Sequence, residues 1–181
     1  MSTNKFLRAS LIIIGIVIGV ILIVGATQPK SISVTRSVVI NAPKSVVFEQ
    51  MVRFKNWPNW SPWSRLDTSM KNTFEGNDGT TGSVYSWVGD DRKTGTVKIT
   101  NTGVNGTELQ FSFKLIKPEA PASSGILKAE DSAGMTKATM TFTNHFDYPW
   151  NAMVILTDLN KTIGPDLEKA MKNLKEVAEK K

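Results

Sequence analysis

The chain has no cysteine and only one histidine, His145, among its 181 residues. The lack of cysteine excludes disulfides, thiolate nucleophiles and cysteine-based metal sites. The sequence also contains no metalloprotease helix, nucleophile elbow, P-loop or dinucleotide-binding glycine pattern. We therefore expect no metal and no cofactor, and the motifs assign no catalytic residue.

Strong charge of one sign is also missing. The formal net charge is +6, and residues 1–30 hold three of those charges, on Lys5, Arg8 and Lys30, with no acidic residue. The other three are spread over the rest of the chain, where lysine and glutamate are interleaved. Such a mild balance is poor support for a nucleic-acid-binding surface, so we predict no nucleic-acid partner.

The longest apolar run lies near the N-terminus, at residues 9–26, and carries no charge. Eighteen helical residues at ~1.5 Å each span about 27 Å, close to the ~30 Å hydrocarbon core of a bilayer. We predict that residues 1–30 are a cytoplasmic stub, a transmembrane anchor and a linker. Lys5 and Arg8 before the run favour a cytoplasmic N-terminus, which places the main domain outside the cytoplasm.

Two alternatives concern the same run. It could be a signal peptide with Val24 and Ala26 before the cut, giving a secreted domain, although signal cores usually have only ~7–15 residues. Gly15 and Gly19 have the spacing that lets two membrane helices approach closely, so a weak dimer through them is a further hypothesis.

Residues 31–181 are predicted to form one domain of the α+β class. A strand at residues 32–40 and a helix at 43–55 precede a loop rich in tryptophan and proline at 57–63. About six short strands follow, separated by turn signals such as Asn105-Gly106. The chain ends in a long helix whose apolar stripe must cover one face of the sheet. The stripe consists of Ile163, Leu167, Met171, Leu174 and Ala178.

The apolar side of this sheet is predicted to line a ligand-binding cavity beneath the helix. Alternation places Phe111, Phe113, Met140 and Phe142 inward and the threonines between residues 139 and 143 outward. Lys172 and Lys175 are expected on the solvent side of the helix. The predicted ligand-binding residues are Trp87, Val97, Ile99, Phe111, Phe113, Met140, Phe142 and Met171.

The remaining candidates are aromatic or titratable. Trp57, Trp60 and Trp63 could form an aromatic binding box, but we favour a plug at one end of the sheet, because large aromatics dominate small cores. His145 is adjacent to Phe146 and near Asp147, as a general base could be. Its parity differs from that of Ala138, Met140 and Phe142, so we expect it to point away from the apolar side.

Several stretches carry a family resemblance by their order and spacing. They are residues 38–43, residues 57–63, Phe74-Glu75-Gly76 with Gly79 and Gly82-Ser83, and residues 163–169 running on to 173–175. Over roughly residues 33–179 the chain resembles the polyketide-cyclase-like branch of the START/SRPBCC helix-grip (Bet v 1-like) superfamily. The resemblance implies a curved antiparallel sheet wrapped around a long C-terminal helix, with a cavity between them. Met140 stands where relatives often have tryptophan, and Ala170-Met171 replaces a common Gly-Leu, so ligand identity does not carry over.

Three functions are compatible with these features. The first is a membrane-anchored domain that binds a hydrophobic small molecule or lipid. The second is a cyclase- or dehydratase-type enzyme with acid/base help from His145, Asp67 or Tyr85. The third is a regulatory or interaction domain with a closed cavity. We favour the first, without an enzymatic reaction, because no paired catalytic groups are recognisable.

Overall fold

The computed structural model describes residues 3–180, which form two compact units. The smaller unit contains the N-terminal residues up to Ile32 together with His145–Asp158, and the larger contains Ser33–Asn144 and Leu159 onward. The two predicted domains, 1–30 and 31–181, remain a prediction. Their terminal residues Met1, Ser2 and Lys181 lie outside the described residues.

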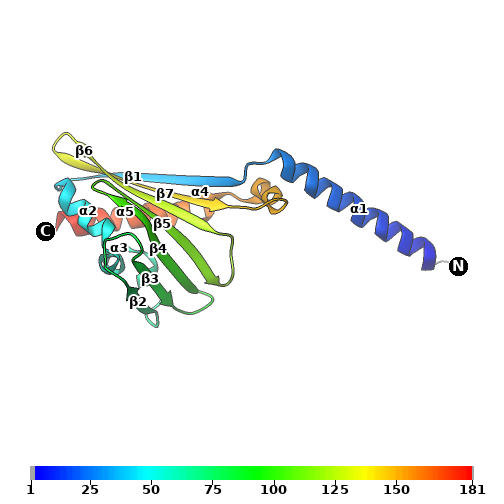
Figure 1. Ribbon diagram of the computed structural model, residues 1–181, viewed down its shortest axis with the longest axis horizontal. Coiled ribbons are helices and arrows are strands. Elements are labelled where there is room, and N and C mark those ends of the chain that lie inside the picture. Colours follow the sequence, from blue (N-terminus) through cyan, green and yellow to red (C-terminus); the bar gives the residue numbers. More distant parts are fainter. Residues whose placement is uncertain (1–2, 181) are drawn as a thin grey trace. The chain divides into compact units, whose positions relative to one another are not determined.

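Within the described residues, seven strands form one sheet in the order β1-β7-β6-β5-β4-β3-β2. The pairs from β2 to β7 are antiparallel neighbours along the chain, and this confirms the predicted run of six strands after the first helix. Figure 1 shows α5, in red, crossing one face of this sheet. The predicted helix-grip fold is thereby confirmed. The strands are β1 (Ser31–Ile40), β2 (Lys71–Glu75), β3 (Val84–Val88), β4 (Thr96–Asn105), β5 (Glu108–Lys117), β6 (Ser123–Ser132) and β7 (Met135–His145).

The first helix of the larger unit is shorter than predicted. α2 (Lys44–Val52) ends three residues early, and Phe54–Asn56 forms a separate 3-10 turn. The reason is tertiary, because the Asp78 carboxylate accepts hydrogen bonds from the Phe54 N–H at 2.7 Å and from the Lys55 N–H at 3.3 Å. These amides are thus held by a distant turn and cannot continue the helix.

The tryptophan-rich stretch is folded, and it supports the plug interpretation. α3 (Trp57–Trp60) is a short helix with Pro58 in its first turn, where a missing backbone donor costs nothing, and the turn Trp63–Arg65 follows it. Trp57 and Trp60 are buried, and their ring N–H groups donate to the carbonyls of Met51 and Gln50. The ring of Trp57 contacts Phe111 of β5 at 5.2 Å.

The C-terminal helix grips the sheet as predicted, with one correction. α5 (Gly164–Glu179) buries Leu167, Met171 and Leu174. Lys175 is half-buried rather than free in solvent, because its ammonium donates to the Val39 carbonyl at 2.7 Å and pairs with Glu179 at 3.2 Å. Since β1 is an edge strand, its unpaired carbonyls are available to such a side chain.

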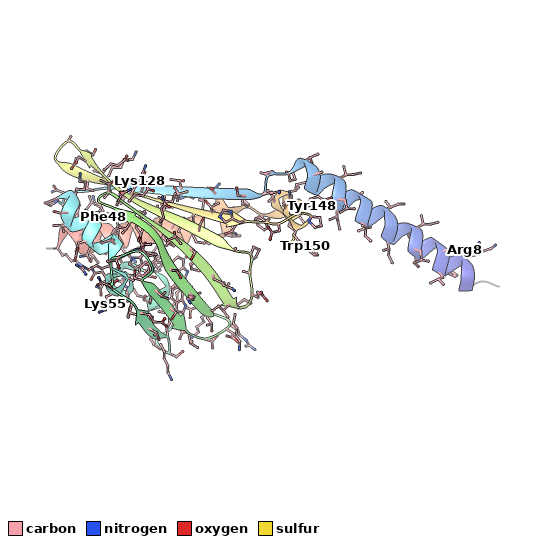
Figure 2. The ribbon with its side chains drawn as sticks, viewed as in Figure 1. Arg8, Phe48, Lys55, Lys128, Tyr148 and Trp150 are labelled. Carbon is pink, nitrogen blue, oxygen red and sulfur yellow. The ribbon has the colours of Figure 1, made fainter. Side chains whose placement is uncertain are left out.

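The smaller unit consists of α1 (Thr3–Thr27) and a 3-10 helix, η3 (Trp150–Leu156). From Lys5 to Thr27, α1 is long and apolar enough to cross a membrane, with a mean hydropathy of 3.0. Figure 2 shows Tyr148 and Trp150 beside the C-terminal end of α1, with Arg8 near its other end. The short α4 (Leu159–Thr162) belongs to the larger unit.

Candidate functional site

The apolar face of the sheet is built by strict alternation along the strands, so that side chains two residues apart share a face. The strand register places Trp87 beside Val97, Ile99 beside Phe113, and Gly125 between Phe111 and Phe142. Met140 lies beside Leu127 in the neighbouring row. Seven of the eight predicted ligand-binding residues therefore belong to one face, and on β7 the threonines at 139, 141 and 143 lie on the other.

Burial separates one of these residues from the rest. Trp87, Phe111, Met140 and Phe142 are all at most 4% exposed, as are Val97, Ile99 and Met171, whereas Phe113 is only half-buried. The Phe113 ring lies 6.4 Å from the Trp87 ring and 5.4 Å from the Phe142 ring, in edge-to-face arrangements with interplanar angles of 64° and 77°. Phe113 thus joins the enclosed aromatic side chains to the part of the apolar face that water reaches.

Polar side chains lie next to Phe113. Ser123 of β6 is the cross-strand partner of Phe113. The Ser123 hydroxyl donates to the Asn144 side-chain oxygen at 2.9 Å. Ser123, Asn144 and Leu115 are also half-buried. The end of the face formed by β5, β6 and β7 therefore combines an apolar wall with a small hydrogen-bonding rim.

The acid/base candidate Asp67 is held in a structural role. Its carboxylate accepts the Ser69 hydroxyl at 2.6 Å, the Asp90 N–H at 2.7 Å and the Thr94 hydroxyl at 2.9 Å. These bonds, with that from the Ser69 hydroxyl the strongest, hold the pKa of Asp67 well below its usual 3.8. Gly89 lies so close that a side chain there would strike the carboxylate. Asp67 therefore fastens the loop after β3 to the loop before β2.

Tyr85 is also engaged in the core. Burial raises the pKa of Tyr85 to about 12, and its hydroxyl donates to the Asn72 side chain at 3.1 Å. His145 is exposed at the end of β7, and Glu75 is exposed at the end of β2. Within residues 3–180 no cluster of three or more histidine or acidic side chains is arranged to hold a metal ion.

A separate groove of about 480 Å³ runs between the edge strand β1 and α5. Met171 lies in its wall, and the groove also includes Glu168 and Lys172. Arg36 also lines this groove, and it donates to the Thr35 carbonyl at 2.9 Å and to the Asn160 side chain at 3.3 Å. In the sequence, Arg36 is a charged residue between Val34 and Val38 on the apolar side of β1, and this pattern does not indicate its role.

Arg36 also lies close to a glycine. A Cβ on Gly164 would lie 2.5 Å from the Arg36 guanidinium, so a larger residue at the start of α5 would require the guanidinium to shift. Through the bond from its Nη1 to the Asn160 side chain, Arg36 ties β1 to the segment that leads into α5.

An apolar, half-open face beneath a gripping helix is typical of proteins that enclose hydrophobic ligands. Residues 31–179 match the polyketide cyclase/dehydrase and lipid transport family, and the chain belongs to that family. This confirms the resemblance that the sequence motifs indicated. No curated protein matches the chain significantly.

Solved structures show the same fold at low sequence identity. An uncharacterised protein from Rhizobium leguminosarum aligns with a TM-score of 0.62 at 14% identity, covering 83% of this chain and 96% of its own. The Zhui aromatase/cyclase from Streptomyces aligns at 0.61 and 15%, covering 82% and 94%. Ara h 8.0201 aligns at 0.55 and 15%, covering 83% and 99%. At these identities the likeness concerns the fold alone.

Proposed function

We propose that this protein binds a hydrophobic small molecule or lipid between the apolar sheet face and α5, and that α1 anchors it in a membrane. The observation that carries the proposal is the chemistry of that face. Its side chains are apolar, while Asp67 and Tyr85, which an enzyme could have used, are engaged in hydrogen bonds within loops and core. Binding without a reaction needs an apolar wall and a few orienting polar groups, and both are present.

Entry of the ligand is assigned to the end of the face at Phe113. Phe113 and Leu115 would contact the apolar body of the molecule, since they are the half-buried members of the wall. Ser123 and Asn144 would orient its polar end, because their side chains offer a donor and acceptors beside the Phe113 ring. The ligand class that fits is an amphiphile with one small uncharged polar group.

Retention of α1 is supported by its contacts at the C-terminal end. The Asn151 amide donates to the carbonyls of Gly25 at 2.6 Å and Gln28 at 2.9 Å, and its side chain is buried. Cleavage after Ala26 would remove one acceptor and expose this side chain, whereas a signal peptide has no need to pack against the mature chain. Gly15 and Gly19 have open space where a Cβ would lie, which leaves that face of α1 available for the weak helix dimer.

The test is mass spectrometry of the full chain extracted from membranes. Under denaturing conditions the mass should include residues 1–26, and a mature chain beginning near Thr27 would contradict the anchor. Under native conditions a co-purifying hydrophobic molecule should be present. Phe113→Glu should lose it, because a carboxylate would be placed in the apolar entrance. The matched control is Ile116→Glu, exposed on the same strand but on the other face, which should keep it. Equal retention by both variants, or no bound molecule in the unaltered protein, would contradict binding at this face.

A further inference from the structure

We propose that residues 148–156, which we call the collar, insert into the surface of the bilayer where α1 leaves it. The proposal rests on membrane anchoring by α1. It adds a second membrane contact, made by a segment 120 or more residues away in the sequence. Its chemical partner is the lipid interface itself, headgroups and the first part of the acyl chains.

The collar exposes an unusual amount of apolar surface. Trp150 is 65% exposed, Ile155 60% and Leu156 85%, and Tyr148 and Met153 are about half exposed. In the larger unit, the exposed large apolar residues, such as Val88 and Ile116, are separated from one another along the chain. Contiguous exposed apolar side chains mark an interaction surface, whereas single ones are normal on a soluble face.

The collar's composition fits a membrane interface. Residues 148–157 carry no charge, and Asp147 and Asp158 flank them on either side. Tryptophan and tyrosine are enriched at the level of lipid headgroups, because their rings are apolar and their polar edges still find hydrogen bonds. Methionine, isoleucine and leucine then supply the part that enters the acyl region.

Specific contacts hold the collar against the end of α1. Asn151 makes the two bonds to Gly25 and Gln28, and just outside these segments the Phe146 N–H donates to the Lys30 carbonyl at 2.8 Å. A Cβ on Gly25 would lie 3.0 Å from the Pro149 carbonyl, so glycine permits this close approach. The last carbonyls of a helix lack partners within the helix, and leaving them unpaired near lipid is costly. Asn151 therefore supplies a hydrogen-bond donor to a carbonyl at the end of α1, at the level of the bilayer where water is scarce.

The identity of the partner follows from a groove of about 240 Å³ in this unit. Its wall combines Ile21 of α1 with Trp150, Met153 and Leu156 of the collar, and nearly all of it is apolar. Ile21 lies inside the stretch that is apolar enough to cross a membrane. The medium that surrounds α1 at the level of Ile21 must therefore also fill the groove. In an anchored protein that medium is acyl chain, which favours lipid over a soluble partner.

The absence of cysteine allows a site-specific test in the full chain. Single cysteines are introduced as Met153→Cys and Ile155→Cys in the collar, Leu11→Cys in α1 and Val88→Cys on β3, each at an exposed position. Each variant is labelled with a nitrobenzoxadiazole fluorophore and reconstituted into vesicles of equimolar phosphatidylcholine and phosphatidylethanolamine. Quenching by aqueous iodide is compared with quenching by lipids that carry a nitroxide near the headgroup.

The collar labels should be protected from iodide several-fold relative to the Val88→Cys label, and the nitroxide lipids should quench them. Iodide quenching equal to that at Val88→Cys, with Leu11→Cys still protected, would overturn the collar and leave the anchor intact. Protection from iodide without quenching by nitroxide lipids would indicate a protein partner and also overturn the proposal. If iodide also quenches the Leu11→Cys label, the proposal that α1 is a membrane anchor is refuted. The proposal for the collar, which depends on it, is then refuted as well.

Discussion

Leu174→Ala tests whether α5 is part of the core that encloses the candidate site. The Leu174 side chain is fully buried, and its neighbour Asn173 donates to the Trp60 carbonyl at 2.9 Å. That bond fixes α5 against α3, so the helix cannot move easily to fill the space left by the lost methyl groups. Leucine-to-alanine changes in cores cost about 2–5 kcal/mol, and limited relaxation places this one in the upper part of that range. For a protein of this size the melting temperature should fall by roughly 5–20 °C.

The assay is thermal unfolding of the full chain in detergent, followed by near-ultraviolet circular dichroism, which reports the packed tryptophans. Lys169→Ala is the matched control, since Lys169 is exposed on the same helix and should change stability by less than about 0.5 kcal/mol. Lys175→Ala should fall between them, at up to about 1 kcal/mol, because it loses the bond to Val39. Equal melting temperatures for Leu174→Ala and Lys169→Ala would show that α5 is not part of the core. They would refute the inference that α5 packs against the sheet.

Two further predictions concern the sheet and its loops. A Cβ on Gly125 would lie 2.1 Å from the buried Phe111 ring, so Gly125→Ala should cost about 1–3 kcal/mol in denaturant unfolding. Gly103→Ala, whose Cβ would meet nothing closer than 3.6 Å, should be close to neutral, and a similar loss in both variants would contradict the packing argument. Because the pKa of Asp67 is lowered in the folded state, its ionised form stabilises the protein above its ordinary pKa of 3.8, and this contribution declines as the pH falls below that value. Asp67→Asn should therefore be less stable than the unaltered protein at pH 7, with a gap that narrows below about pH 4, and a gap independent of pH would contradict the assignment.

Patterns with a local cause were readable from the sequence. The alternation of Ala138, Met140 and Phe142 predicted which side of β7 is buried, because successive strand side chains point to opposite faces. The spacing of Leu167, Met171 and Leu174 predicted the buried stripe of α5 for the equivalent helical reason. The length and apolar composition of residues 9–26 likewise predicted the long apolar helix α1.

Interactions between distant segments were not readable in this way. The end of α2 depends on Asp78, which removes the Phe54 amide from the helix, and the half-buried state of Lys175 depends on the edge position of β1. Asn151 caps Gly25 across 126 positions of sequence. The uncharged run at residues 148–157 was visible in the sequence, but its meaning depends on lying against α1. Propensity and periodicity act over one or two turns of backbone, whereas a hydrogen-bond partner or an exposed surface is settled only when remote segments meet in three dimensions.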